Sequence, residues 1–414
     1  MDLFEEYLTL GNGMEPPRVY HRWAVTSAIA TLLGRRCFIP FGHGKIYPHM
    51  YVMLVGKPGT RKSTAIGLAS KLLRLAGYHQ FAPDKVSKEK FLVEMIALNQ
   101  SHSEDGEIDL LAELDKLHEI ADSEILIDAD EFNDFMGQAN GEFLMMLGKI
   151  WDCSKEEYRH PKLRGDDVIV PKPIVNILAG NTHTGIMQAF PPEAVGTGWM
   201  SRVLFVNGKE SGRRITFPEI LGEDRLAPVV AQFKSIRELK GAFTLSADAR
   251  KVADEIYQNP RSLGDYRFKH YESRRFTHLL KLSMIMAAAD LRVNILARDV
   301  IRANTQLYFA EKYMPEALGE YGKSRDAEAT NTVLDALDSA TEPLTIRELW
   351  KIVSSDVKSL QELGDLVGNL ISADKVQTFK YKGHSALIRK KTVMEEWPDH
   401  LIDDTFLHEE EKLM

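Results

Sequence analysis

The sequence predicts an α/β protein with a parallel-sheet core between helices, followed by a smaller helical domain. An apolar run at residues 51–55 leads into a glycine-bearing turn and then into a long helical segment. Two further apolar runs, near residues 124–129 and 173–180, also end in polar residues. Strands that alternate with helices in this way are typical of a parallel sheet.

Composition narrows the class of protein. A chain of 414 residues is long enough for two or three domains, and 44% apolar with 27% charged residues is ordinary for a globular protein. The two cysteines, Cys37 and Cys153, cannot form a disulfide framework or a four-cysteine zinc site, so we expect a reducing cytoplasm. No apolar run approaches the length of a membrane span, and the acidic N-terminus lacks a signal-peptide pattern.

The net charge of −8 is concentrated at the C-terminus. Residues 395–414 carry eight carboxylates against a single lysine, so the rest of the chain is nearly neutral. Overall charge therefore does not exclude a nucleic-acid partner, because the local field at a groove decides such binding.

Residues 1–48 form a helical N-terminal region. We expect helices at residues 2–10 and 18–34, the second with a core face of Trp23, Ile29, Ala30 and Leu33, and short strands at 38–41 and 45–47. The core then spans residues 49–208. It begins with the strand at 51–55, and further helices are expected at 65–77, 87–99, 107–121 and 142–151.

The turn after the first core strand has the layout of a phosphate-binding P-loop. Gly56 and Gly59 let backbone N–H groups point inward, and the helix that opens at Lys62 adds a positive N-terminus. Lys62 can reach the β- and γ-phosphates of ATP, and the Ser63 hydroxyl can ligate Mg²⁺. Arg61 stands where the common pattern has glycine. The residues expected around the phosphates are Gly56, Pro58, Gly59, Thr60, Arg61, Lys62, Ser63 and Thr64.

The next apolar strand ends in Asp128-Ala-Asp-Glu131. In P-loop ATPases one such carboxylate holds Mg²⁺ and the adjacent one polarises the attacking water. Asp130 and Glu131 fit these two roles best, with Asp128 as the alternative metal partner.

Two further positions are candidates for completing the site. Asn181, or Thr182 beside it, follows the strand at residues 173–180 and either senses the γ-phosphate or caps a helix. Arg202 precedes the strand at residues 203–206 and either acts as an arginine finger on a neighbouring subunit or forms a surface ion pair.

Residues 155–172 are rich in basic side chains and contain two turn signals, which predicts a hairpin that either contacts DNA or is a solvated surface feature. Residues 209–322 then read as a helical lid and connection, with a short helix before residue 240 and longer ones at 245–259, 271–289 and 299–318. Arg274, His278 and Lys281 share one helix face, and Arg275 is adjacent. Arg275 either reaches the γ-phosphate or belongs to a solvated face.

Residues 327–393 are expected to form a winged-helix-like domain. Helices are predicted at 327–339, 345–353 and 357–373, with Thr345 and Glu348 as a capping box. A hairpin at 375–391 follows, with basic and aromatic side chains and no carboxylate. Such modules contact either DNA or protein. The acidic tail, residues 394–414, is either a disordered solubilising segment or a docking peptide.

Taken together, these motifs resemble a known group of proteins. The Gly59-Thr-Arg-Lys-Ser63 loop, the acidic strand tip, Ser201-Arg202 before a Leu-Phe-Val strand and the Arg-rich helix with a Leu-Lys-Leu run are similar to phage and mobile-element replicative helicases, or to the helicase part of primase-helicases. The resemblance covers roughly residues 18–290. It implies a RecA/AAA+-like P-loop NTPase core, a ring that is often hexameric, and ATP-driven movement on single-stranded or forked DNA.

The resemblance also implies a replication partner. No primase-like segment is visible, so we expect a separate primase or a polymerase, contacted through the acidic tail. The alternative function is an ATP-switched initiator or regulator that binds duplex DNA without unwinding it.

Overall fold

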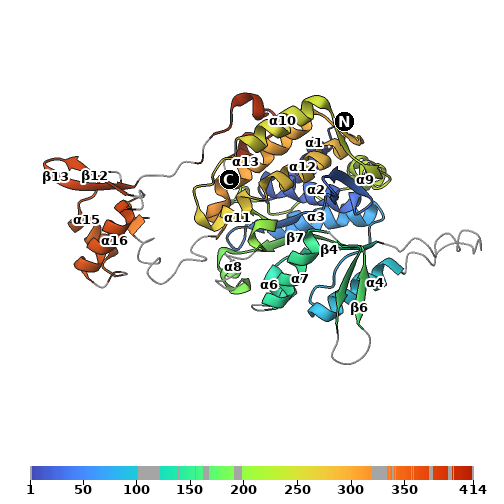
Figure 1. Ribbon diagram of the computed structural model, residues 1–414, viewed down its shortest axis with the longest axis horizontal. Helices are drawn as coiled ribbons and strands as arrows, with labels where there is room; N and C mark the ends of the chain where they lie inside the picture. Colours follow the sequence, from blue (N-terminus) through green and yellow to red (C-terminus); the bar gives the residue numbers. More distant parts are fainter. Residues whose placement is uncertain are drawn as a thin grey trace, which may run out of the picture. The chain divides into compact units, whose positions relative to one another are not determined.

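The computed structural model divides into two compact units, Met1–Gly319 with Glu396–Met414, and Glu320–Glu395 (Figure 1). The ranges expected as an N-terminal region, a core and a lid thus pack together in the first unit. The described residues are 2–100, 122–137, 140–153, 155–161, 167–190, 198–318, 333–334, 336–337, 340, 342–355, 357, 359–372, 376–389, 394 and 396–412.

A four-stranded parallel sheet forms the centre of the first unit, which confirms the α/β class. Its strands are β3 (Tyr51–Val55), β4 (Ser123–Ala129), β7 (Pro173–Asn181) and β8 (Val203–Asn207). Their order across the sheet is β4-β7-β3-β8. Val55 pairs with Asn181 on one side and with Asn207 on the other, so the strand ends meet at one edge. Ligands of open parallel sheets bind at this carboxyl edge.

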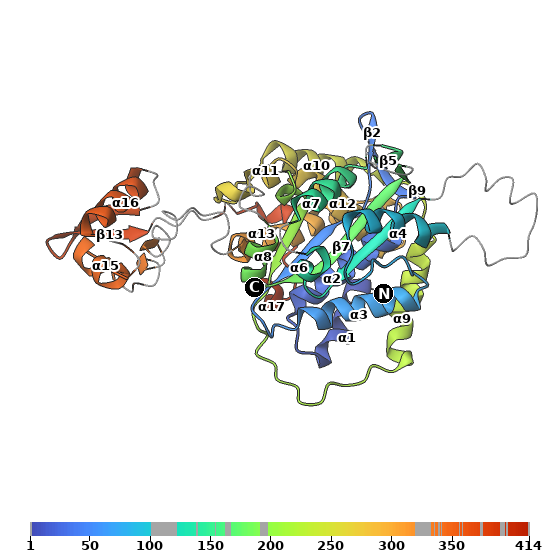
Figure 2. The same ribbon diagram turned by 90° about the horizontal axis from the view of Figure 1, so that it is seen from below.

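Helices cover both faces of the sheet (Figures 1 and 2). On one face lie α2 (Arg18–Leu33) and α3 (Lys62–Leu75), and on the other lie α6 (Phe132–Met136) and α7 (Gly141–Trp151). A single core face was expected for α2, but every residue from Val19 to Leu33 is buried. The reason is that α2 contacts the sheet, α1 (Leu3–Leu10) and α9 (Glu223–Arg237) at once.

The expected lid helices pack onto the same unit. They are α10 (Ala247–Gln258), α11 (Lys269–Glu272), α12 (Arg275–Ala289) and α13 (Ala297–Leu318). The helix α13 lies along β8, and α12 lies between α13 and α2. At 15 residues, α9 is also longer than the short helix expected before residue 240.

Short strands form small sheets around the core. An antiparallel pair joins β1 (Cys37–Phe41) and β2 (Gly44–Ile46), and β1 also pairs with β9 (Gly241–Ala242). A second small sheet joins β10 (Thr244–Leu245) and β11 (Asn294–Ile295). The predicted basic hairpin is present as β5 (Glu157–His160) and β6 (Val168–Pro171), with Lys162 and Arg164 outside the described residues. The remaining helices of this unit are α4 (Lys88–Gln100) and α8 (His183–Ala189), while the helix expected at 107–121 lies outside the described residues.

The C-terminal segment returns to the first unit. Trp397, Leu401, Phe406 and Leu407 are buried, and the segment contains the short turns η6 (Asp399–Leu401) and α17 (Glu409–Lys412). The expectation of a disordered tail is therefore wrong for residues 396–412. These apolar side chains pack within the chain, and binding of a partner by the segment stays a prediction.

The second unit contains α15 (Ile346–Val353), α16 (Leu360–Ser372) and an antiparallel hairpin of β12 (Val376–Tyr381) and β13 (His384–Arg389). The capping box of Thr345 and Glu348 is present as predicted. Leu349, Leu363 and Leu387 belong to its own hydrophobic core. Most of the helix expected at 327–339, and Lys375, Lys390 and Lys391 of the hairpin, lie outside the described residues.

In the described part of the chain, no helix is long and apolar enough to cross a membrane.

Candidate functional site

Atoms of Tyr20 and Gly208 pack closely against the turn between β3 and α3. A Cβ atom on Gly56 would lie 2.3 Å from the Tyr20 hydroxyl oxygen and 2.8 Å from the Gly208 carbonyl oxygen, so only glycine fits. The Tyr20 hydroxyl donates to the carbonyl oxygen of Val55 at 2.6 Å. Gly59 and Arg61 both have positive φ, at 90° and 60°. These left-handed residues curl the chain into the start of α3.

The ammonium group of Lys62 lies inside this turn. It donates to the carbonyl oxygens of Gly56 and Lys57, at 3.0 and 3.2 Å, and lies 3.3 Å from the Thr60 hydroxyl. Burial lowers the pKa of Lys62, while the negative charge of Glu131 acts in the opposite direction. At the N-cap, the Arg61 side chain does not bond the first-turn amides. The Thr64 N–H donates to the Arg61 carbonyl oxygen at 3.2 Å, whereas the N–H groups before it have no acceptor within the helix, so the turn presents N–H donors and a positive charge together.

The acidic end of β4 packs against the turn. A Cβ atom on Gly180 would lie 2.3 Å from the Asp130 carbonyl oxygen and 3.4 Å from the Lys62 Cβ atom. The side chains of Asp130 and Glu131 are exposed at this edge. Asp128 instead accepts a hydrogen bond from the Ser70 hydroxyl at 2.8 Å, and burial raises the pKa of its carboxyl group.

Asn181 ends β7 between the turn and the acidic residues. Its carbonyl oxygen accepts the Gly56 N–H at 3.3 Å, and its side-chain amide donates to Asn133 at 3.1 Å. Thr182, rather than Asn181, caps α8 by accepting the Gly185 N–H. At the same edge Asn207 ends β8 and contacts His183 at 3.2 Å. Asn207 was missed, although a polar residue after an apolar strand is the same signal that indicated Asn181.

A cavity of about 610 Å³ opens beside the turn. The turn contributes Gly59, Thr60 and Arg61, and the segment after β8 contributes residues 210–216. Arg61 forms an ion pair with Glu15 at 2.6 Å, and Glu15 accepts the Ile215 N–H at 2.9 Å. That backbone hydrogen bond is the main cause of the lowered pKa of Glu15. Arg213 and Arg214 also line the cavity. The sequence marks these two arginines only as a basic pair shortly after a strand.

Arg202 lies at the amino end of the parallel strands, opposite the carboxyl edge that carries the glycine turn. It ends the short turn η4 (Met200–Arg202) just before β8, whereas the glycine turn follows the carboxyl end of β3. Its guanidinium forms an ion pair with Asp152 at 2.7 Å, and Arg274 binds the same carboxylate at 3.1 Å. Both guanidinium groups also lie within 6 Å of the Trp151 ring, at 5.6 and 5.4 Å from its centroid. Arg202 thus has no access to the turn of its own chain.

Arg275 is not near the turn. It forms a buried ion pair with Glu311 at 2.8 Å, donates to Asn304 at 2.9 Å and lies 4.9 Å from the centre of the Trp397 ring. Neither role expected for it fits, because the side chain is neither solvated nor directed at a phosphate site. Arg274, one residue earlier and partly exposed, is the arginine that lies beside Arg202.

The expectation of a solvated face is also wrong for His278 and Lys281, which are both buried. The Lys281 ammonium group donates to the His49 carbonyl oxygen at 2.9 Å and lies 3.9 Å from the centre of the Trp151 ring. Burial lowers the pKa of Lys281 to about 7.

The residues brought together at the carboxyl edge suit a phosphate group with a hard cation. Ser63 and Asp130 supply exposed oxygen atoms on the two sides of the turn, and Mg²⁺ needs only one or two protein oxygens besides phosphate and water. Among the described residues, no cluster of three or more histidine, cysteine or carboxylate side chains could hold a metal by itself. The two side chains therefore fit Mg²⁺ that phosphate and water also bind.

No protein-family profile matches the chain, and no curated protein is significantly similar to it.

Proposed function

We propose that this protein binds ATP with Mg²⁺ and hydrolyses it to move along DNA, as a ring-forming helicase of phage or mobile-element replication. The observation that carries the ATPase part is the position of Lys62. Its charge is held inside the turn by carbonyl oxygens of Gly56 and Lys57, next to the exposed acidic end of β4. A bound phosphate replaces these weak acceptors with anionic ones.

In this proposal each residue at the carboxyl edge has one role. Lys62 and the first-turn amides of α3 bind the β- and γ-phosphates, while Ser63 and Asp130 hold Mg²⁺, which neutralises charge on the phosphates when bound. Glu131 orients and deprotonates the attacking water. The exposure of Asp130 and the engagement of Asp128 with Ser70 favour Asp130 as the metal partner. Asn181 holds the two halves of the site together through Asn133.

Other residues are candidates for binding the sugar and base of the nucleotide, and for contacting the nucleotide from a second subunit. The cavity beside the turn, with Arg213 and Arg214 on its wall, has room for the sugar and base. Arg202 reaches a phosphoryl group only from a neighbouring chain, because it lies at the other edge of its own sheet. A ring of identical subunits supplies such a neighbour.

Movement on DNA rests on the resemblance and on two basic hairpins. Arg159 of β5 exposes 65% of its side chain although it pairs with Asp167, and Lys382 of the second unit exposes 66% although it pairs with Glu342. Both lie on strands or turns that project basic groups, as single-strand binding surfaces do. The second candidate is an ATP-switched initiator or regulator, favoured by the separate second unit with its helices and basic hairpin.

The deciding experiment is steady-state ATP hydrolysis with and without single-stranded DNA, with Lys62→Ala as the blank. Stimulation of about tenfold, or roughly 1.4 kcal/mol of coupling, supports the motor. Slow hydrolysis that DNA does not change, together with tight duplex binding, supports the regulator. Hydrolysis by Lys62→Ala at the wild-type rate would contradict the site itself.

A further inference from the structure

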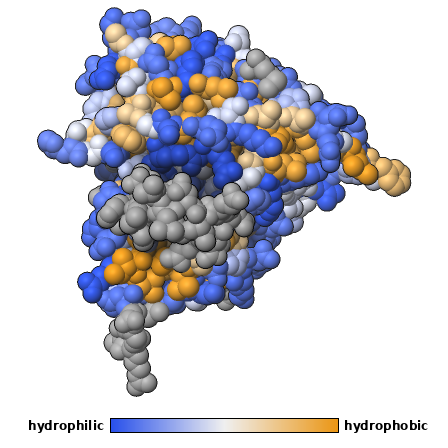
Figure 3. All heavy atoms as spheres, turned by 90° about the vertical axis from the view of Figure 1, so that its right-hand side faces the viewer, coloured by the Kyte–Doolittle hydropathy of each residue, from blue (hydrophilic) through white to orange (hydrophobic). Residues whose placement is uncertain are grey.

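Two apolar side chains on the segment after β8 have almost no contact with the rest of the protein. Phe217 exposes 90% of its surface and Ile220 exposes 92%. Apolar side chains reach the surface elsewhere, as Figure 3 shows on one face, but no other large one in the described part of the chain exposes more than 60%. Single exposed apolar residues are ordinary, whereas a projecting pair is a mark of an interaction site. We refer to Phe217 and Ile220 as the apolar knob.

A second cavity of about 470 Å³ has a mainly apolar wall. The hairpin β1–β2, the β9–β10 segment, α10 and α12 form it. The apolar wall residues include Ile39, Phe41, Phe243, Tyr257, Phe276 and Leu280. At its rim Phe41 is 51% exposed and Tyr257 is 58% exposed, and the Tyr257 ring lies 4.7 Å from the Phe276 ring. We refer to this cavity as the apolar pocket.

The knob and the pocket lie on opposite sides of the first unit. In Figure 2 the segment between β8 and α9 runs along the lower edge, whereas α10 and β2 lie at the upper edge. A chain therefore cannot place its own knob in its own pocket. A second copy can, and such a contact between two different surfaces repeats from copy to copy.

We propose that the apolar knob of one copy docks into the apolar pocket of the next, so that the chain assembles head to tail. Charge complementarity supports a second copy of the chain as the partner that fills the apolar pocket. Residues 216–224 contain three carboxylates and no basic residue; Glu219 is paired with Arg225 at 2.6 Å, which leaves Glu223 and Asp224 as the negative charges beside the knob. The pocket wall includes Arg250 beside Asp254, and the adjoining β1–β2 hairpin has exposed Lys45 on β2 and no carboxylate. The acidic flank of the knob thus meets a rim with an excess of positive charge.

This contact also brings two parts of the candidate site together. The knob follows Ile215 and Thr216, which line the cavity beside the glycine turn. The pocket residue Phe276 lies two positions after Arg274, which shares the Asp152 carboxylate with Arg202. Docking therefore turns the arginine side of one copy toward the glycine-turn side of its neighbour. Only this consequence rests on the proposed function, because the docking itself does not depend on ATP hydrolysis.

The test compares two double variants by sedimentation velocity of the full chain. Phe217→Ser with Ile220→Ser removes the knob, and Phe41→Ser with Tyr257→Ser removes the pocket rim. We expect the wild type to assemble and each variant to remain monomeric at the same concentration. An equimolar mixture should give dimers and nothing larger, because it contains one intact type of contact. The matched control is Met145→Ser, which removes another exposed apolar side chain and should assemble like the wild type.

A disulfide cross-link tests the same contact even if the serine variants do not fold. A chain that carries both Ile220→Cys and Tyr257→Cys should form a ladder of disulfide-linked dimers, trimers and larger species under mild oxidation. The two native cysteines are buried and do not interfere. Each single cysteine variant should give dimers at most. A wild type that is monomeric throughout, a knob variant that assembles normally, or a double cysteine variant without a ladder would each overturn the docking.

Binding of a fluorescent ATP analogue separates this proposal from the proposed function. Monomeric knob variants should still bind the analogue, since the glycine turn is complete in one chain. If the wild type assembles through the knob but binds no nucleotide, the docking stands and the proposed function fails. If the wild type binds and hydrolyses ATP while the knob variants assemble unchanged, the docking fails and the proposed function stands.

Discussion

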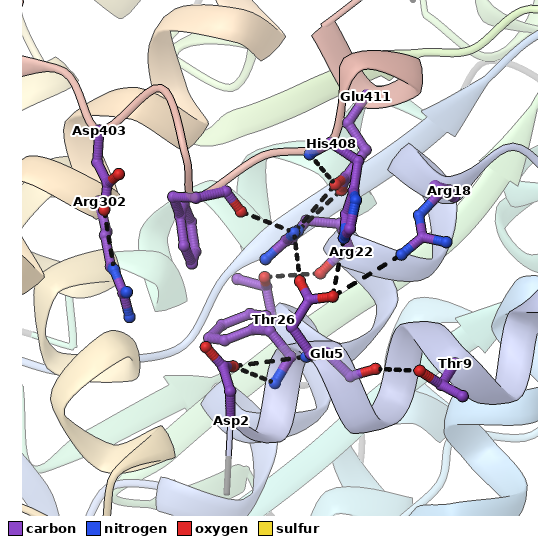
Figure 4. Close-up of polar contacts among 12 residues, drawn as sticks. Asp2, Glu5, Thr9, Arg18, Arg22, Thr26, Arg302, Asp403, His408 and Glu411 are labelled. Atoms are coloured by element: carbon purple, nitrogen blue, oxygen red, sulfur yellow. Dashed lines mark hydrogen bonds and ion pairs between the residues drawn. The ribbon is translucent and has the colours of Figure 1, made fainter.

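Arg22 of α2 and Glu411 of α17 form a buried, bidentate ion pair (Figure 4). The Arg22 guanidinium donates to the two carboxylate oxygens at 2.8 and 2.9 Å, and also to the Phe406 carbonyl oxygen at 3.0 Å. Both side chains are at most 2% exposed. The same helix carries Tyr20, which supports the strand end below the glycine turn. The C-terminal segment therefore stabilises the helix on which the candidate site rests.

The first prediction concerns this pair. Glu411→Gln should lower the free energy of unfolding by about 3 kcal/mol, because it removes the buried counter-charge of Arg22 and leaves only the half-exposed Glu5 carboxylate, at 3.6 Å. The double variant Arg22→Met with Glu411→Leu should recover most of that loss. Urea unfolding measures both, and Glu410→Gln at an exposed neighbouring position is the control. Equal stability of Glu411→Gln and the wild type would mean that the pair does not hold the segment.

The second prediction separates two aspartates on β4. Asp130→Asn should reduce ATP hydrolysis by about 10²-fold or more, because a metal ion supplies several kcal/mol of charge stabilisation. Asp128→Asn should keep most of the activity, since an amide oxygen still accepts the Ser70 hydrogen bond. Titration of hydrolysis with Mg²⁺ compares them. The reverse result, with only the Asp128 variant impaired, would assign the metal to Asp128.

The third prediction concerns Arg202. If it acts on the nucleotide of a neighbouring chain, Arg202→Ala should reduce the rate of hydrolysis by about 10³-fold and leave nucleotide binding nearly unchanged. Mixing Arg202→Ala with Glu131→Gln should restore part of the activity, because some interfaces then combine an intact glutamate with an intact arginine. Lack of recovery at every mixing ratio would show that Arg202 does not act between chains.

Local patterns predict the strands and the glycine turn well. The apolar run Tyr51–Val55 is a strand as expected, and β7 ends at Asn181 as expected, whereas β8 continues one residue beyond the expected strand to Asn207. These patterns depend on neighbours along the chain, because a strand buried on both faces needs a continuous apolar run. The order of the strands has no such local signal. The position of β7 between β3 and β4, which places Asn181 at the centre of the site, could be read only from the structure.

Burial of charged side chains was the main source of error. Arg275 looks like any exposed helical arginine, because its partner Glu311 is 36 positions away. The C-terminal segment looks disordered because its carboxylates are counted without Arg22, which is 389 positions earlier. In both cases a distant partner compensates a charge that local sequence would leave in water. The apolar residues Trp397 and Phe406 were visible signals, but they fitted a docking peptide equally well.

The last prediction concerns Lys281, whose ammonium group is buried beside His49 and Trp151. Its pKa of about 7 in the folded protein lies below the ordinary value of 10.5. Between these values the unfolded chain binds more protons than the folded one, so this group makes stability rise with pH. From pH 7 to 9 the gain should be about 2 kcal/mol, since each pH unit is worth at most about 1.4 kcal/mol. Lys281→Met removes the titrating group and should lose this rise.

The measurement is urea unfolding of the wild type and Lys281→Met at pH 7, 8 and 9, compared as differences. Differences are needed because other buried groups also titrate, and burial raises the pKa of nearby Cys153 to about 11. Lys251→Met, at a side chain that is 79% exposed, should follow the wild type at every pH. A constant difference between the wild type and Lys281→Met would mean that Lys281 stays charged in the folded protein. In that case Trp151 and the His49 carbonyl oxygen compensate its charge without loss of the proton.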